Sequence, residues 1–302
     1  MTAISLDRAA RSLVEKATGL ASTGSLRTVR RWARGRKDSV RLGHADYAIV
    51  SYGKSGRTWV NVMLSKYFQL RFKLPDYLLI HYNNLNKRNS AIPKILFTHD
   101  TYIRDYTKAG GSKALFYSKP TMLLARHPAD TAVSLYFHWR YRMQPHKKNL
   151  NNFPPHGTDI AIYDFMLREL PRVVRYLNEW TSEIPRIENL LLVRYEDLRT
   201  NTRAELGRML RFMGQDPSDA EINAAVEFAS FENLKQLEKE GAYSQRTRRL
   251  TPGDSSNPDS FKVRRAKVGG YRDYFDDDQV QRIENYIRDN LDPSLGYTAA
   301  AS

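Results

Sequence analysis

The sequence predicts an α/β fold in three layers, with a central parallel sheet flanked by helices. Four short apolar runs alternate with segments of helical apolar spacing, which is typical of a parallel sheet covered on both faces. The 302 residues are 41% hydrophobic, enough to build a sizeable core. We divide the chain into a basic N-terminal extension, residues 1–44, and one large domain, residues 45–302.

The predicted strands are continuous apolar runs, as buried parallel strands are. They cover residues 47–52, 94–98, 121–125 and 189–193. Helical spacing predicts helices over residues 59–68, 128–142, 163–183, 203–213, 219–228 and 276–290. Two segments lack periodicity, an Asn-rich stretch at 83–89 and a loop at 241–271. A loop as long as the second is typical of a functional lid or a disordered stretch.

Composition narrows the function classes without choosing one. Lys and Arg number 48 against 33 Asp and Glu, a formal net charge of +15, which attracts nucleic acid, anionic lipid, sulfated glycan or a phosphate-rich cofactor. The absence of cysteine excludes a disulfide framework and a thiolate metal site. No apolar run approaches the roughly 20 residues of a membrane span, and residues 1–20 lack the apolar core of a signal peptide. We therefore expect a cytoplasmic protein.

The N-terminal extension concentrates arginine between residues 27 and 37. We interpret it as a solvated amphipathic helix followed by a basic connector. The alternative is an arm that makes peripheral contact with anionic membranes, with Trp32 as an interfacial anchor.

A short loop, Gly53-Lys54-Ser55-Gly56-Arg57-Thr58-Trp59, separates the first strand from the first helix. Its small residues let backbone N–H groups converge on an anion, and the helix N-terminus adds its positive end. The nucleotide P-loop would need glycine at position 48, where Ala48 stands. No later strand ends in an aspartate placed to hold Mg²⁺. The loop therefore predicts an anion site that is too short for a Walker motif.

This loop resembles the 5′-phosphosulfate motif P-K-S-G-T-T-W of the sulfotransferases that use 3′-phosphoadenosine 5′-phosphosulfate (PAPS). Gly53 and Arg57 depart from it. Three further family motifs follow in order: the 3′-phosphate region at 124–134, Tyr-Glu-Asp-Leu at 195–198, and Arg-Arg-Ala-Lys-Val-Gly at 264–269. The ordered set covers most of residues 45–275. The resemblance implies a P-loop-like fold and transfer of a sulfuryl group from PAPS to an acceptor hydroxyl.

The resemblance also implies the residues that bind PAPS. The phosphosulfate is assigned to Lys54, Ser55, Gly56, Arg57 and Thr58. The 3′-phosphate is assigned to Arg126, Ser134, Arg264 and Arg265, beside Ala266 where the family has glycine. Adenine is assigned to a slot formed by Trp59, Tyr195 and Phe231, with Ser230 beside it.

The implied catalytic residues are His99 and Lys54. His99 closes Phe97-Thr98-His99, which matches the family's K-T-H, and a neutral imidazole there can take the acceptor's proton. Lys54 is implied to stabilise the leaving phosphate in an in-line displacement that needs no metal. Phe97 replaces a family lysine, for which Arg57 or Lys94 could compensate.

Two other functions are alternatives to sulfuryl transfer. A kinase-type nucleotide enzyme would need a Walker loop and Mg²⁺ carboxylates, and a nucleic-acid-binding module rests on charge alone. We therefore expect no nucleic-acid partner.

The loops at 77–92, 100–119 and 139–156 mix aromatic residues with Asn, Lys and Arg. This mixture favours a small-molecule or glycan acceptor, with a saccharide or saccharide-lipid hydroxyl preferred.

Overall fold

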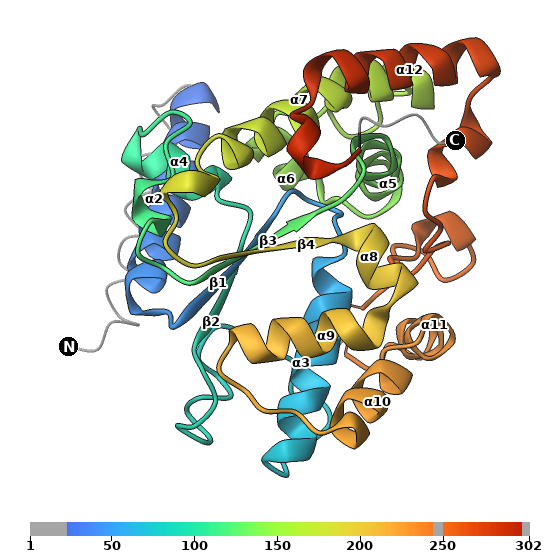
Figure 1. Ribbon diagram of the computed structural model, residues 1–302. Helices are drawn as coiled ribbons and strands as arrows, with labels where there is room; N and C mark the ends of the chain where they lie inside the picture. The colour runs from blue at the N-terminus through green and yellow to red at the C-terminus, as the bar shows by residue number, and fades with distance from the viewer. Residues whose placement is uncertain (1–22, 244–249, 298–302) are drawn as a thin grey trace.

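The computed structural model describes residues 23–243 and 250–297, which fold around one parallel sheet (Figure 1). Its four strands lie in the order β2-β1-β3-β4. They are β1 (Tyr47–Ser51), β2 (Ile95–Thr98), β3 (Thr121–Ala125) and β4 (Leu190–Arg194). Ile49 of β1 lies opposite Phe97 on one side and Met122 on the other. Each strand lies within one residue of its predicted range.

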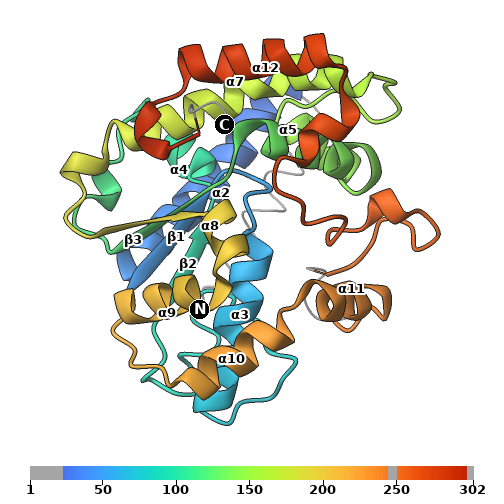
Figure 2. The same cartoon turned by 45° about the vertical axis from the view of Figure 1, so that its right-hand side comes forward.

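Helices cover both faces of the sheet, and alternate strand residues enter the two cores. One face carries α2 (Thr23–His44), α4 (Thr101–Thr107), α5 (Pro128–Tyr141), α7 (Ile162–Thr181) and α12 (Asp277–Asn290). Its core includes Val50 and Leu123. The other face carries α3 (Arg57–Arg71), α9 (Thr202–Phe212) and α10 (Asp219–Phe228), and its core includes Ile49 and Met122. Figure 2 shows the sheet between these two groups of helices, so the predicted three-layer α/β fold is confirmed.

The six helices predicted from apolar spacing all occur, while several short ones were not predicted. Among the missed helices are α4, α6 (Pro145–Leu150), α8 (Tyr195–Thr200) and α11 (Phe231–Lys239). Short 3₁₀ turns occur at Ala114–Phe116, Ile184–Arg186, Pro258–Ser260, Gly270–Tyr274 and Pro293–Leu295. Residues 83–88 form turns, as expected for an irregular segment. Residues 244–249 of the predicted 241–271 loop lie outside the described part of the chain.

The basic N-terminal segment forms one continuous helix from residue 23 to 44, so the predicted connector at 27–37 is wrong. Helix α2 lies against α4 (Figure 1). Their backbones approach so closely that a Cβ on Gly35 would lie 1.9 Å from the Tyr102 carbonyl oxygen. Leu42 is buried in the main core. Residues 1–22 lie outside the described residues.

The outward side of α2 exposes Trp32, whose ring makes an edge contact with Tyr106 at 5.2 Å between centroids. Contact of this side with anionic membranes stays a prediction. Within the described ranges, no helix combines the length and apolar character needed to cross a bilayer.

Candidate active site

The carboxyl ends of all four strands meet at one cavity of about 730 Å³. The loop 52–56 follows β1, His99 follows β2, Arg126 follows β3 and Tyr195 follows β4. This edge of a parallel sheet is where open α/β folds bind their ligands. The topology therefore brings four separate sequence motifs to one place.

Almost all the residues predicted for the site line this cavity. Lining it are Lys54, Gly56, Arg57, Thr58, Trp59, His99, Arg126, Ser134, Tyr195, Phe231, Arg264, Arg265 and Ala266. Two predicted residues do not line it. Ser55 is 1% exposed, and the Ser230 hydroxyl caps α11 by accepting a hydrogen bond from the Asn233 N–H while lining a smaller adjoining hollow.

The loop after β1 turns through two left-handed residues, Lys54 at φ 77° and Gly56 at φ 90°. Gly56 is the N-cap residue of α3 and makes no side-chain cap hydrogen bond to the first turn of that helix. A Cβ on Gly56 would lie 2.7 Å from Cδ2 of Tyr195, so the loop and the Tyr195 ring fit only because this residue is glycine. Backbone N–H groups at such a turn and helix start form an anion-binding concavity.

Lys54 lies among other cations. Burial lowers its pKa well below the usual value, and the nearby Arg142, Lys262 and Arg126 lower it further. The Arg126 guanidinium also donates to the Lys54 carbonyl oxygen at 3.2 Å. A phosphate-type anion would relieve this mutual repulsion, so the electrostatics of the loop fit an anionic ligand.

A second cationic region lies between α5 and the segment after residue 261. The Arg126 guanidinium lies 4.3 Å from the Tyr195 ring centroid, and its buried Nε has no hydrogen-bond partner among the described residues. Arg264 and Arg265 both donate to the Tyr274 hydroxyl, and Arg264 stacks 3.8 Å from the Phe137 ring centroid. Three guanidinium groups are thus held with donors available for a phosphate.

Two buried carboxylates hold the segment that carries these arginines. Asp130 accepts from the N–H groups of Gly269 at 2.8 Å and Tyr271 at 3.0 Å. Glu238 accepts from the N–H groups of Lys262 at 2.6 Å and Val263 at 2.8 Å. Sequence analysis gave neither residue a role. The position of Asp130, four residues after Arg126, was the sequence signal that could have indicated its role. Glu238 offered no such signal, because it lies in a helix that was not predicted.

Ala266 adopts a left-handed conformation at φ 49°, at the position where the family motif has glycine. The backbone thus makes the turn that glycine would favour, at a steric cost of about 1 kcal/mol for a residue with a Cβ.

Aromatic rings from α3, α8 and α11 line the same cavity. The Trp59 and Tyr195 rings meet edge to face at 5.9 Å, and Trp59 Nε1 donates to the Ala229 carbonyl oxygen at 2.9 Å. The Arg199 guanidinium lies 5.5 Å from the Trp59 ring centroid. Together with Phe231, these rings offer flat apolar surface to the cavity.

His99 is oriented by the neighbouring strand, since its Nδ1 lies 2.7 Å from the Ser51 carbonyl oxygen. A carbonyl can only accept, so Nδ1 carries the hydrogen and Nε2 has a free lone pair. Burial, reinforced by Arg57, lowers the His99 pKa to about 3, which keeps the ring neutral at physiological pH. Phe97 packs into the core on the α3 side. Of the two cations suggested as substitutes for the family lysine, Arg57 lines the cavity and Lys94 does not.

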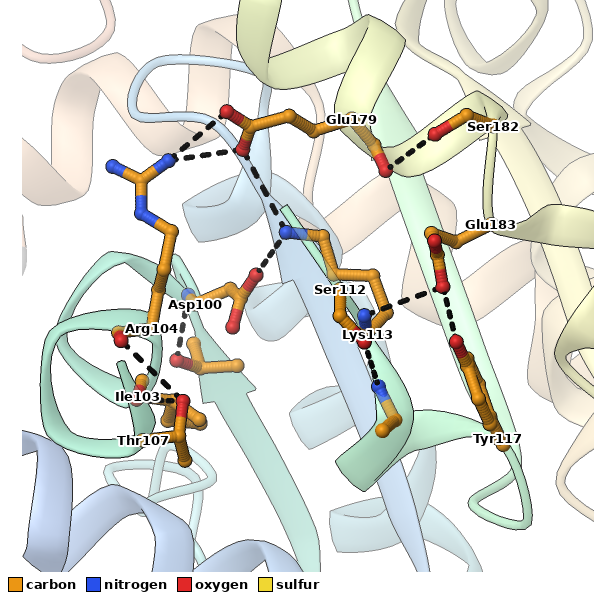
Figure 3. Close-up of polar contacts among 12 residues, drawn as sticks. Asp100, Ile103, Arg104, Thr107, Ser112, Lys113, Tyr117, Glu179, Ser182 and Glu183 are labelled. Carbon is orange, nitrogen blue, oxygen red and sulfur yellow. Dashed lines mark hydrogen bonds and ion pairs between the residues drawn. The ribbon is translucent and has the colours of Figure 1, made fainter. Parts of the chain in front are cut away.

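A buried ion-pair network begins at Asp100, the residue that follows His99 in the sequence (Figure 3). Asp100, a left-handed residue at the start of α4, pairs with the fully buried Lys113 at 2.8 Å. Lys113 lies 3.7 Å from Glu179 of α7, which in turn pairs with Arg104 at 2.9 Å. Since Arg104 and Glu179 both line the cavity, the network joins α4 to α7 at the cavity wall.

The cavity walls formed by α2, α6 and α7 carry further cations that sequence analysis missed. Arg31 and Arg34 of α2, Lys147 of α6, and Arg172 and Arg175 of α7 all line the same cavity. Their helices are distant in sequence, and only the packing of α2 against α4 brings the first two to the site. In the sequence, the concentration of arginine at 27–37 was the one feature that could have pointed to Arg31 and Arg34.

The sequence matches the sulfotransferase domain family over residues 44–294. This chain belongs to the sulfotransferase family. Human sulfotransferase 6B1 is 24% identical over 267 residues, which cover 84% of this chain and 78% of that relative. Flavonol 4′-sulfotransferase of Flaveria chlorifolia is 22% identical over 264 residues, covering 82% and 79%.

Solved sulfotransferase structures share the fold. Mouse sulfotransferase SULT7A1 was solved in complex with PAP (adenosine 3′,5′-bisphosphate). It aligns with a TM-score of 0.54 at 20% identity, and the alignment covers 84% of this chain and 86% of that one. The predicted family and the P-loop-like fold are therefore confirmed. In residues 23–243 and 250–297, no three or more His, Cys, Asp or Glu side chains are grouped to hold a metal ion.

Proposed function

We propose that this sulfotransferase moves the sulfuryl group of PAPS to a hydroxyl of a small-molecule or saccharide acceptor. One observation carries the proposal: a single cavity brings together the anion-binding loop, a second cationic region and an oriented neutral histidine. The two cationic regions match the two anionic ends of PAPS, and the histidine lies where an acceptor could meet the phosphosulfate end.

The donor would be held by residues from three elements. Arg126, Arg264 and Arg265 would grip the 3′-phosphate with charged hydrogen bonds, and the unpaired Arg126 Nε fits such an additional acceptor. The N-terminus of α3, with Lys54 and Thr58, would hold the phosphosulfate. Ser134 lines the cavity from α5 and would add a hydroxyl donor.

Bound PAPS supplies an activated sulfuryl group on an anhydride oxygen. His99 accepts the acceptor's hydroxyl proton on Nε2, because its Nδ1–H is committed to the Ser51 carbonyl oxygen. The negative charge of a bound donor would raise the depressed His99 pKa toward neutrality and strengthen this base. Lys54 stabilises the negative charge that develops on the leaving phosphate.

A second histidine, His138, also lines the cavity, but its geometry suits a base less well. Its buried Nδ1 has no hydrogen-bond partner among the described residues, so no contact at this nitrogen fixes the tautomer as the Ser51 carbonyl oxygen does for His99. His99 is therefore the better candidate for the base.

The acceptor half of the cavity combines rings with hydrogen-bonding groups. Tyr102 and Phe153 line it beside Asn151, and the Tyr102 hydroxyl donates to Asn151 Oδ1 at 3.0 Å. Aromatic surface with fixed polar groups suits a saccharide hydroxyl. A relative in the family is named as acting on a flavonol, which is likewise a small hydroxylated molecule.

Binding to immobilised adenosine 3′,5′-bisphosphate (PAP) tests this proposal. We expect the wild-type protein to be retained and eluted by free PAP, and Lys54→Ala to bind at least about tenfold more weakly through loss of a charged contact. Excess duplex DNA should not elute it. Elution by DNA, or retention unchanged by Lys54→Ala, would contradict the proposal.

A further inference from the structure

The acceptor half of the cavity carries more positive charge than its carboxylates neutralise. Arg31 pairs with Asp105 at 2.5 Å and Arg104 with Glu179 at 2.9 Å. Arg172 pairs with the buried Glu169 at 3.0 Å. Each of these three arginines therefore has its own anionic partner.

Three other cations on the same walls lack such an ion pair within the described residues. Within residues 23–243 and 250–297, Arg34, Lys147 and Arg175 form no ion pair with a carboxylate, although all three line the cavity. Arg34 donates only to the Tyr102 hydroxyl, at 3.2 Å, and its guanidinium lies 5.5 Å from that ring's centroid. Arg175 is exposed and lines the cavity, and its side chain makes no hydrogen bond to the described residues.

One of these three cations, Arg175, acts electrostatically on Tyr52, as do the paired Arg104 and Arg172. Tyr52 follows Ser51, whose carbonyl oxygen orients His99. Tyr52 also packs edge to face on Tyr176 of α7, at 5.2 Å between ring centroids. A group bound by Arg175 would therefore lie near the proposed transfer site.

The position of Arg34 is fixed by packing. Gly35 lets α2 touch the α4 backbone, and the Tyr102 hydroxyl that Arg34 contacts is itself bonded to Asn151 of α6. The Asn151 amide in turn donates to the Lys147 carbonyl oxygen at 3.0 Å. These contacts hold helices α2, α4 and α6 together as one wall, and its cations Arg34 and Lys147 form no ion pair among the described residues.

We infer that this wall and α7 form an anion subsite, and that the acceptor carries a carboxylate, sulfate or phosphate group besides its reacting hydroxyl. The inference rests on the proposed function, since it takes the cavity beside His99 as the acceptor site. An oxyanion there would form charged hydrogen bonds with Arg34 and Arg175, while Lys147 would add a point charge. A neutral acceptor of the same shape would leave these cations unmatched.

The test uses full-length protein saturated with PAP, so that the donor sites cannot take the added anion. Two matched probe pairs are titrated by calorimetry: 4-nitrophenyl β-D-glucuronide against the glucoside, and glucose 6-phosphate against glucose. We expect the charged member of at least one pair to bind about tenfold more tightly, and the pair that responds tells carboxylate from phosphate recognition.

Three variants complete the design. Arg175→Gln removes a side chain that makes no hydrogen bond, so its fold should be intact, and it should reduce the preference for the anion severalfold. The double variant Arg34→Gln/Arg175→Gln should abolish it. Arg282→Gln is the matched control, because Arg282 is an exposed arginine of α12 away from the cavity, and it should leave the preference unchanged.

Equal affinity within both probe pairs would overturn the inference, as would a preference that survives in the double variant or no measurable binding of any probe. Failure of the proposed function appears earlier in the same experiment, as absence of PAP binding before any acceptor is added, and it would remove the premise of the subsite.

Discussion

Replacing the arginines assigned to the 3′-phosphate should separate two nucleotides that differ only in that group. Arg126→Gln removes a guanidinium whose side chain is 11% exposed. Losing its charged contact to phosphate should cost about 2 kcal/mol, or roughly 30-fold in affinity for PAP. Arg126 also donates to the Lys54 carbonyl oxygen at 3.2 Å. Losing that bond should cost about 1 kcal/mol more, for any nucleotide that uses the loop.

The assay compares PAP with adenosine 5′-monophosphate, which lacks the 3′-phosphate. For Arg126→Gln we expect losses of about 3 kcal/mol for PAP and about 1 kcal/mol for the monophosphate. Arg265 is 43% exposed and does not contact the loop, so Arg265→Gln should weaken PAP about tenfold and leave the monophosphate unchanged. Calorimetry on wild type, both variants and Arg282→Gln measures these differences.

Equal losses for the two nucleotides would refute the reasoning, because they would show that neither arginine reads the 3′-phosphate. A large loss for both ligands in Arg265→Gln would instead show that this side chain supports the fold of the segment. Thermal melting of the variants tells these two outcomes apart.

Four further predictions follow from single positions. His99→Gln should bind PAP normally and lose turnover by at least about 100-fold, whereas His138→Asn should keep most of it; the reverse pattern would move the base to His138. Gly56→Ala should abolish PAP binding because its Cβ would meet Tyr195, and calorimetry showing normal affinity would contradict this. Ala266→Gly should raise the free energy of unfolding in urea by about 0.5–1 kcal/mol, because glycine relieves the left-handed strain. An unchanged or lower free energy of unfolding would contradict this. Burial lowers the pKa of His99 to about 3 and that of His127 to about 4, against about 6.5 in the unfolded chain. Because the unfolded chain binds these protons first, the free energy of unfolding should be full above about pH 6.5 and fall by about 1–2 kcal/mol per histidine toward pH 5. If His127→Gln leaves the slope of unfolding free energy against pH unchanged, the prediction is contradicted.

The sheet and the positions of the residues proposed to bind the donor could be predicted, because both depend on local sequence. Each strand is an uninterrupted apolar run, and His99, Arg126 and Tyr195 each follow directly on such a run. Once the strands are parallel and adjacent, their carboxyl ends must meet. The order of the family motifs then indicated which residues line the cavity. Ser230 is an exception, since it does not line the main cavity and its hydroxyl caps α11, a helix that apolar spacing did not indicate.

The acceptor half could not be predicted, because it depends on packing between distant segments. Arg31 meets Asp105 across 74 residues, and Arg34 reaches Tyr102 across 68. The docking of α2 that makes both contacts depends on the absence of a side chain at Gly35. An arginine-rich stretch read alone looks like a solvated surface, and only tertiary structure shows that part of it lines a cavity.

The most direct test of sulfuryl transfer is to follow ³⁵S from labelled PAPS into an acceptor. Wild-type protein is incubated with the labelled donor and a set of neutral and acidic phenols and saccharides, and products are separated by chromatography. We expect acceptor-dependent label in product with equimolar release of PAP, and loss of both signals in His99→Gln. Release of free labelled sulfate alone, or no label in any acceptor from a protein that binds PAP, would contradict the account.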